Sequence, residues 1–211
     1  MTDPVAACPD HGFFAGETCP ACDRSGTPVF SGERRRRLSK YCSGALRHFP
    51  DDAGLTLDGA GWTTLSALVD AAEAQYEWAD DRAVRALVAT DPKGRFELSA
   101  DGGRVRAAYG HSVAVELDAD PTPVPDILYH GTAPDNRESI RADGLEPMGR
   151  QQVHLSGDVE TARSVGRRHD PDPIVFAVDA AAMVADGHTV TRRGTGVFTT
   201  DRVPPQYLDE R

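Results

Sequence analysis

The sequence lacks several features that define common protein classes. It has no run of about 18 apolar residues, which a membrane-spanning helix requires. Its first thirty residues contain Asp3, Asp10 and Glu17 but no apolar stretch typical of a secretory signal. It also has no glycine-rich P-loop and no G-x-G-x-x-G motif, so these two phosphate-binding loops are excluded. We therefore expect a cytoplasmic protein that has no membrane partner and holds any nucleotide in another way.

Lysine is almost absent as well. The 23 basic residues are Lys40, Lys93 and 21 arginines, against 23 Asp and 10 Glu, which gives a net charge of −10. An Asp-rich, Lys-poor surface suits high salt and predicts a halophilic microbe as the source; a GC-rich genome is the alternative explanation. Because an acidic chain binds nucleic acid poorly as a whole, any RNA must be held by a local basic site.

Three of the four cysteines stand together near the N-terminus. The pattern is C-x₂-H followed by C-x₂-C, and two such turns can close a tetrahedral zinc site. Residues 1–28 are therefore predicted to be a structural zinc knuckle whose ligands are Cys8, His11, Cys19 and Cys22. A chance cluster in an unstructured tail and a redox C-x-x-C are the alternatives. Cys42 lies elsewhere and is predicted to be a small buried apolar residue.

Residues 33–117 read as three helices followed by a hairpin. Apolar residues at helical spacing predict a first helix over 33–49 that Pro50 ends, and further helices are predicted after Thr63 or Thr64 and after Asp80 or Asp81. Alternation over 95–107 around Asp101-Gly102-Gly103 predicts a β-hairpin with one charged face, on which Arg104 and Arg106 are expected to be solvent-exposed or to make weak RNA contacts. This order is typical of a winged-helix lobe. The run Arg34 to Arg37 is either an RNA-backbone patch or a solvated helix face.

The second half, 126–211, follows a proline-rich linker over 118–125. Strands are predicted at 127–129, 153–155, 174–178 and 196–199, and helices at 135–143, ending at Gly144, and at 158–169. The pattern indicates a small lobe of mixed α/β structure.

Arginines and histidines gather in four short islands. These are Leu46-Arg47-His48, Lys93-Gly94-Arg95-Phe96, Tyr129-His130-Gly131-Thr132 and Arg150-Gln151-Gln152-Val153-His154-Leu155-Ser156. Guanidinium forks and imidazoles are suited to holding phosphate. Each island also has a structural explanation, such as a helix cap at Arg47-His48 or a solvated strand at Arg95. The order of all four therefore carries more weight than any one of them.

Seven segments, in order, resemble the NAD⁺-dependent RNA 2′-phosphotransferases of the Tpt1/KptA family. They are Leu38-Ser39-Lys40 with Leu46-Arg47-His48, Gly61-Trp62, Arg95-Phe96, Gly110-His111-Ser112, Tyr129-His130-Gly131-Thr132, the 150–156 island, and 203–208. The resemblance covers residues 34 to 208. It implies an α+β fold, with an N-terminal winged-helix lobe that grips RNA and a C-terminal ADP-ribosyltransferase-like lobe that binds NAD⁺. The zinc knuckle is not part of the family's usual pattern.

The resemblance also implies a reaction and the residues that perform it. An internal RNA 2′-phosphate attacks the NAD⁺ ribose and expels nicotinamide, and the ribose 2″-hydroxyl then attacks phosphorus. The products are 2′-hydroxyl RNA and ADP-ribose 1″,2″-cyclic phosphate, and no catalytic metal takes part. The implied catalytic tetrad is Arg47, His48, Arg95 and Arg150. The implied NAD⁺-binding residues are His130, Gly131, Thr132, Ser139, His154 and Ser156. The protein is expected to be a monomer. Its expected partner is 2′-phosphorylated RNA, such as spliced precursor tRNA.

Two other functions remain open from the sequence. An ADP-ribosyltransferase on the same scaffold would modify terminal phosphates of nucleic acid or a protein. A non-catalytic zinc and winged-helix protein would only bind nucleic acid, although the acidic charge disfavours that function.

Overall fold

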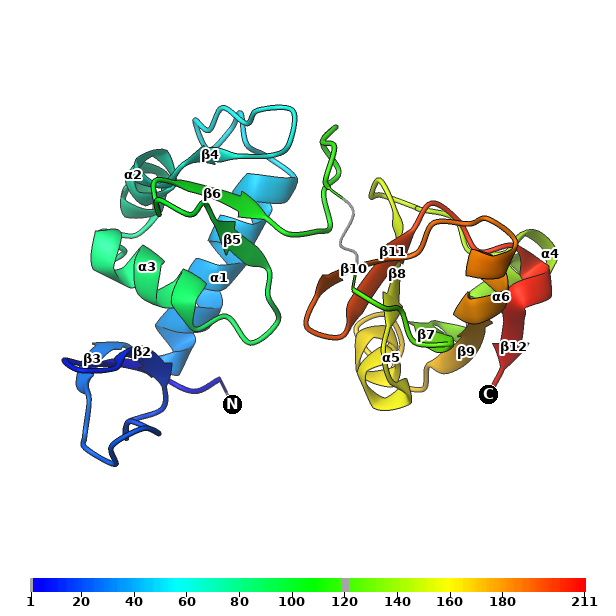
Figure 1. Cartoon of the computed structure of the whole chain (residues 1–211), viewed down its shortest axis with the longest axis horizontal. Coiled ribbons are helices and arrows are strands. Elements are labelled where there is room, and N and C mark those ends of the chain that lie inside the picture. The colour runs from blue at the N-terminus through cyan, green and yellow to red at the C-terminus, as the bar shows by residue number, and fades with distance from the viewer. Residues whose placement is uncertain (1, 119–121) are drawn as a thin grey trace. The chain divides into compact units, whose positions relative to one another are not determined.

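The computed structural model describes residues 2–118 and 122–211. The chain divides into two compact units, Met1–Leu117 and Asp118–Arg211 (Figure 1). Residues 119–121 of the predicted proline-rich linker lie outside the described residues. No helix in the described part of the chain combines the length and apolar character needed to cross a bilayer.

A small antiparallel sheet opens the first unit. Its strands, in the order β2-β1-β3, are β1 (Val5–Cys8), β2 (Gly12–Ala15) and β3 (Thr27–Phe30). The sheet lies near the start of α1, and β2 and β3 contact α3 (Figure 1). Val5 and Phe30 are buried in the same core as the helices of this unit. The segment 1–28 therefore contains ordered strands in addition to the two predicted turns.

The first helix, α1 (Gly32–Arg47), closely follows the predicted range. Ser31 caps it, because its hydroxyl accepts a hydrogen bond from the Arg34 backbone N–H at 3.3 Å. The buried residues recur every three or four positions, which fixes one face of α1 against the core. They include Leu38, Cys42, Ala45 and Leu46. Cys42 is fully buried as predicted, and burial raises the pKa of its thiol to about 12.

Two further helices and a second three-stranded sheet complete the first unit. The helices are α2 (Leu65–Gln75) and α3 (Asp81–Ala89), capped by Thr64 and Asp80 as the sequence predicts. The strands are β4 (Thr63–Thr64), β5 (Phe96–Leu98) and β6 (Arg104–Ala107), in the order β4-β6-β5. In the β5–β6 hairpin Phe96 pairs with Ala107 and Leu98 pairs with Val105, so the predicted hairpin is confirmed.

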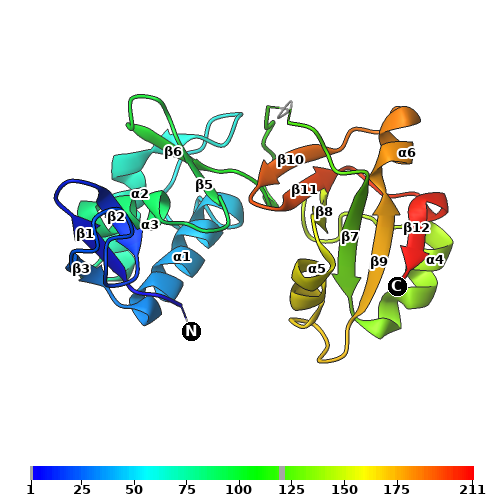
Figure 2. The ribbon, with the colours of Figure 1, turned by 60° about the horizontal axis from the view of Figure 1, so that its bottom comes forward.

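A six-stranded sheet forms the centre of the second unit, with the order β10-β11-β8-β7-β9-β12 and antiparallel pairing throughout (Figure 2). The strands are β7 (Ile127–Thr132), β8 (Val153–Ser156), β9 (Ile174–Asp179), β10 (Thr191–Gly194), β11 (Val197–Thr200) and β12 (Leu208–Glu210). The helices are α4 (Arg137–Asp143), α5 (Val159–Gly166) and α6 (Ala180–Ala185), with the short 3₁₀ turns η1 (Pro134–Asn136) and η2 (Pro205–Tyr207). The sequence predicted four of these strands and the regions of α4 and α5, but not β10, β12 or α6.

The two faces of this sheet are covered by different helices. Leu128 and Val178 face each other in the β7–β9 register and belong to a core that includes Ile140 of α4 and Met183 of α6. Gly131 is on the opposite side of β7 because successive strand residues alternate in direction. There it meets α5, and a Cβ atom at this position would lie 1.9 Å from the Ala162 carbonyl oxygen. Glycine at 131 therefore allows β7 and α5 to approach.

We predict that Gly131→Ala destabilises the second unit by roughly 1–3 kcal/mol, because backbone on both sides must move to admit the methyl group. Thermal unfolding followed by circular dichroism measures the loss. Gly149→Ala is the matched control, since no atom lies within 4 Å of its Cβ position. Equal unfolding midpoints for the two variants would contradict this account of the β7–α5 contact.

Candidate functional site

The C-terminal end of α1 presents the first pair of predicted site residues. Arg47 is the last residue of the helix, and His48 leaves the helical conformation while its N–H still donates to the Gly44 carbonyl oxygen at 2.8 Å. The Arg47 carbonyl accepts the backbone N–H of Ser112 at 3.0 Å, and the Ser112 hydroxyl lies 3.0 Å from Nδ1 of His48. The loop after β6 therefore holds both residues in place.

Arg95 is held by two other elements of the same unit. Its guanidinium lies 3.0 Å from the Asp91 carboxylate, whose side chain is only 3% exposed, and its backbone N–H donates to the same carboxylate at 2.6 Å. A third contact runs from the guanidinium to the hydroxyl of Ser39, which is buried on α1. The two terminal nitrogens of the guanidinium are thus held, one by α1 and the other by the turn before β5.

The segment after β6 contacts both Arg47 and Arg95, because the Ala108 backbone N–H donates to the Arg95 carbonyl oxygen at 2.8 Å and Tyr109 lies against Arg47. The Arg47 guanidinium lies 4.7 Å from the centre of the Tyr109 ring, a distance typical of a cation–π contact. Burial raises the pKa of the Tyr109 phenol, and the positive charges of Arg47 and Arg95 both oppose that shift. Gly110 follows with φ +87°, a conformation that favours glycine, and a Cβ atom there would lie 3.4 Å from the Arg47 guanidinium. The structure therefore places Arg47, His48 and Arg95 around one loop of the first unit.

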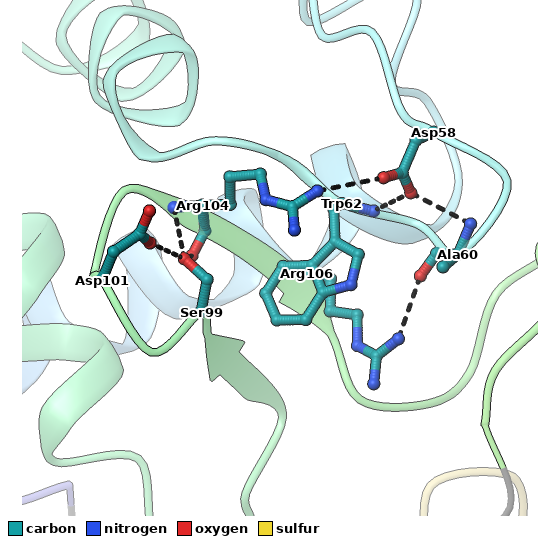
Figure 3. A network of polar contacts seen from close by, with 7 residues as sticks. All are labelled: Asp58, Ala60, Trp62, Ser99, Asp101, Arg104 and Arg106. Atoms are coloured by element: carbon teal, nitrogen blue, oxygen red, sulfur yellow. Dashed lines mark hydrogen bonds and ion pairs between the residues drawn. The ribbon is translucent and has the colours of Figure 1, made fainter.

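Arg106 differs from the sequence prediction. It was expected on a solvent-exposed face, but it is only 9% exposed. It pairs with Glu97 at 2.7 Å. It also donates to the Ala60 carbonyl oxygen and lies against the Trp62 ring, 4.6 Å from its centre (Figure 3). Alternation along β6 does place Arg106 on the charged face; the Trp62 side chain covers that face. Arg104 stays half exposed beside the same ring and pairs with Asp58 (Figure 3).

His130 leads the second group of predicted residues, on β7. Its Nδ1 lies 3.1 Å from the His154 carbonyl oxygen on β8. Burial lowers the pKa of His130, the His154 carbonyl opposes the shift, and the positive charge of Arg150 adds to the lowering. Arg150 is exposed on the loop before β8, close enough to act on His130 electrostatically.

The remaining predicted residues do not all face the same way. Ser156 pairs with Tyr129 across β7 and β8, so it shares the sheet face that α5 covers. His130 pairs with Phe176 of β9, and its side chain is on the opposite face of the sheet. Thr132 is buried and accepts a hydrogen bond from the Asn136 side chain at 2.8 Å. Ser139 is exposed on α4 and donates to the Asn136 carbonyl oxygen.

Four residues that organise these groups were not predicted as site residues. They are Ser39, Asp91, Tyr109 and Asn136. Asp91 carried a usable signal, because it stands four positions before Arg95 and has the opposite charge. Tyr109 directly precedes the Gly110-His111-Ser112 segment, but nothing in its neighbourhood pointed to a stacked guanidinium.

The predicted zinc ligands lie together at the start of the chain. One ligand atom from each of Cys8, His11, Cys19 and Cys22 can be chosen so that all four lie within 4.8 Å of one another. Sγ of Cys8 lies 3.4 Å from Nδ1 of His11 and 3.8 Å from Sγ of Cys22. Arg24 donates to Cys22 at 3.4 Å and lowers the pKa of that thiol to about 6.

Comparison with known proteins identifies the chemistry of this class. Residues 33–202 match the model of a family described as "RNA 2'-phosphotransferase, Tpt1 / KptA family". A "Probable RNA 2'-phosphotransferase" of Haloarcula marismortui is 58% identical over 99% of this chain and 98% of its own length. Proteins with the same name from Methanosarcina mazei, at 36% identity over 97% of both chains, and Acaryochloris marina, at 42% over 84% of this chain and 98% of its own, are also similar.

The matches define an enzyme that transfers phosphate from RNA. The chain belongs to the RNA 2′-phosphotransferase (Tpt1/KptA) family. The cysteine and histidine cluster precedes residue 33, so it lies outside the segment that the family model matches.

We predict that Asp91→Asn destabilises the first unit by about 1.5–3 kcal/mol, because it removes a largely buried charge-assisted hydrogen bond to Arg95. The matched control is Asp81→Asn, which breaks the Asp81–Arg85 pair at the same four-residue spacing on an exposed surface. That change should cost less than about 1 kcal/mol. Denaturant unfolding compares the two, and equal losses would show that the Asp91–Arg95 pair is no better shielded than a surface pair.

Proposed function

We propose that this enzyme removes an internal 2′-phosphate from RNA with NAD⁺ as the second substrate. The proposal rests on one structural observation, the contacts of Arg47, His48 and Arg95 with the single segment 108–112, in a chain of the RNA 2′-phosphotransferase family. The positive charges of Arg47 and Arg95 both act on the Tyr109 phenol, and Arg95 is joined to the same segment by the Ala108 backbone N–H. Two nearby positive charges repel each other, and a bound anion would offset that repulsion. A phosphate dianion is such an anion and matches the arginine fork.

The architecture supports a division of labour between the two units. Residues 33–117 combine three helices with the β4-β6-β5 sheet, an arrangement suited to a winged-helix lobe that binds RNA. Residues 126–211 form the unit with the six-stranded antiparallel sheet, proposed as an ADP-ribosyltransferase-like lobe that binds NAD⁺. In that lobe the proposed NAD⁺-binding residues are His130, Gly131, Thr132, Ser139, His154 and Ser156.

The first chemical step forms a bond between a 2′-phosphate oxygen and C1″ of the ribose, and the bond from C1″ to nicotinamide breaks. In the second step the 2″-hydroxyl oxygen bonds to phosphorus, and the RNA 2′-oxygen leaves with a proton. Arg47, Arg95 and Arg150 hold the phosphate and stabilise charge on its oxygens. His48 accepts or aligns the hydroxyl proton. The substrates supply the nucleophiles, so the protein needs none.

A direct assay tests this function. The full chain is mixed with an oligonucleotide that carries one internal 2′-phosphate, with and without NAD⁺, and the products are separated by thin-layer chromatography. The proposal requires NAD⁺-dependent appearance of 2′-hydroxyl RNA and ADP-ribose cyclic phosphate. Transfer of label from NAD⁺ to a terminal phosphate, without loss of the 2′-phosphate, would favour an ADP-ribosyltransferase that modifies nucleic-acid ends.

We predict that Arg150→Ala lowers kcat/KM on this substrate about 10²–10³-fold, the usual effect of removing one group that stabilises transition-state charge. Arg163→Ala is the control in the same unit. Arg163 is half-exposed on α5 and pairs with Glu160 at 3.0 Å. Its kcat/KM should stay within about twofold of wild type. If both variants behave alike, Arg150 does not contact the reacting phosphate.

The N-terminal cluster is proposed to hold a structural zinc ion. A zinc tetrahedron with Zn–S bonds of about 2.3 Å has edges of about 3.8 Å. The separations from Cys8 to His11 and to Cys22 and the 3.6 Å from Cys19 to His11 fit those edges. When bound, the ion would tie β1 to the loop before β3 and leave the proposed chemistry to other residues.

We predict one zinc ion per chain in the purified protein and its loss in Cys22→Ser, together with a lower unfolding midpoint of the first unit. Metal analysis and thermal unfolding measure both effects. Cys42→Ala is the control: it removes a cysteine from the core and should keep the zinc. A zinc content unchanged by Cys22→Ser would eliminate the site.

A further inference from the structure

A second group of arginines on the first unit rests on aromatic rings. The Arg34 guanidinium lies 4.9 Å from the centre of the Trp78 ring, and the Arg37 guanidinium lies 4.7 Å from that of Tyr76. Tyr76 and Trp78 are stacked with their centres 5.3 Å apart, and Tyr41 meets Tyr76 edge-on at 6.0 Å. We call Arg34, Arg37, Tyr41, Tyr76 and Trp78 the arginine–aromatic strip.

The hydrogen-bond donors of the strip are not used by carboxylates. Within the described ranges 2–118 and 122–211, neither Arg34 nor Arg37 lies within ion-pair distance of an acidic side chain, and both are exposed. By contrast Arg85, Arg104 and Arg106 of the same unit each pair with an aspartate or glutamate. An aromatic ring holds a guanidinium by its face and leaves its N–H groups at the edge for another acceptor.

Part of the strip lies on the same helix as part of the candidate site, because α1 carries Arg37 and Tyr41 and ends at Arg47. Arg37 and Tyr41 are four residues apart and so lie on one side of α1, and His48 directly follows the last residue of that helix. The eleven residues from Arg37 to His48 span about 16 Å along the helix axis. Phe49, beside His48, lies 6.2 Å from Tyr41 between ring centres, so aromatic contacts continue along this side.

We infer that the arginine–aromatic strip binds the phosphodiester backbone of the RNA strand that carries the 2′-phosphate, at a distance from the reacting group. The inference rests on the proposed function for the identity of the ligand. Arg34 and Arg37 contact phosphates, and the rings beneath them hold the guanidiniums ready. In an acidic chain such local contacts supply the affinity that net charge opposes.

Binding to RNA tests the strip without relying on catalysis. A fluorescent 12-nucleotide single-stranded RNA is titrated with the full chain at several salt concentrations. Arg34→Ala/Arg37→Ala is expected to weaken binding at least tenfold and to reduce the slope of log K against log salt by about 1.4, which is about 0.7 for each lost phosphate contact. Trp78→Leu keeps apolar packing but removes a ring, and should weaken binding at least threefold.

The matched control is Arg36→Ala/Lys40→Ala. It removes two exposed positive charges from the same helix, and neither side chain rests on a ring in the described structure. It should weaken binding less than threefold. Equal weakening by the two double variants, or none by Arg34→Ala/Arg37→Ala, would overturn the inference, because net charge rather than the strip would then govern binding.

Two substrates of different length separate this inference from the proposed function. Arg34→Ala/Arg37→Ala should lower kcat/KM at least tenfold on the 2′-phosphorylated 12-mer and leave it within twofold on a 2′-phosphorylated dinucleotide. A similar loss on both substrates contradicts the strip. If wild type dephosphorylates neither substrate, the proposed function fails, and the binding titration still decides whether the strip holds RNA.

Discussion

Arginine side chains must be kept from the carboxylates that outnumber them, and this constraint shapes the first unit. The sequence has 33 acidic residues and 23 basic ones, so an arginine without a defined contact would readily pair with an acid. Aromatic rings provide another contact at Arg47, Arg34 and Arg37. A ring fixes the direction of a guanidinium without neutralising its charge. Where a carboxylate is used instead, as at Arg95, the buried Asp91 fixes one side of the fork.

The segment before β1 is connected to the rest of the first unit through a buried arginine. Arg35 donates to the Asp3 carbonyl oxygen at 3.2 Å and also to the carbonyl oxygen of Thr90, where α3 ends. Thr90 directly precedes Asp91, the partner of Arg95. The segment before β1, the start of α1 and the end of α3 thus meet at one side chain. The segment before β1 therefore contacts the region that positions Arg95, although the two lie far apart in sequence.

The sequence predicted the elements with a strong period and missed those fixed by tertiary contacts. The stripe of Leu38, Cys42 and Leu46 located α1, and the C-x₂-H and C-x₂-C spacing located the cluster. The strands β1 to β3 have four residues each, too few for a clear alternation. The burial of Arg106 depends on Trp62, which alternation along β6 alone does not reveal. The contact of Arg47 with Tyr109 was missed for the same reason, since it joins segments about sixty residues apart.

In the second unit the electrostatic environment of a buried histidine differs from that of the arginines in the first. Burial and the positive charge of Arg150 both lower the pKa of His130, which favours the neutral imidazole. Under the proposed function, this histidine lies in the lobe that binds a dinucleotide whose nicotinamide ring is cationic. A protonated imidazole there would repel the ring, whereas a neutral one can still donate or accept a hydrogen bond. Under the proposed function, the positive charge for phosphate is therefore assigned to the arginines, and His130 is assigned to NAD⁺ as an uncharged contact.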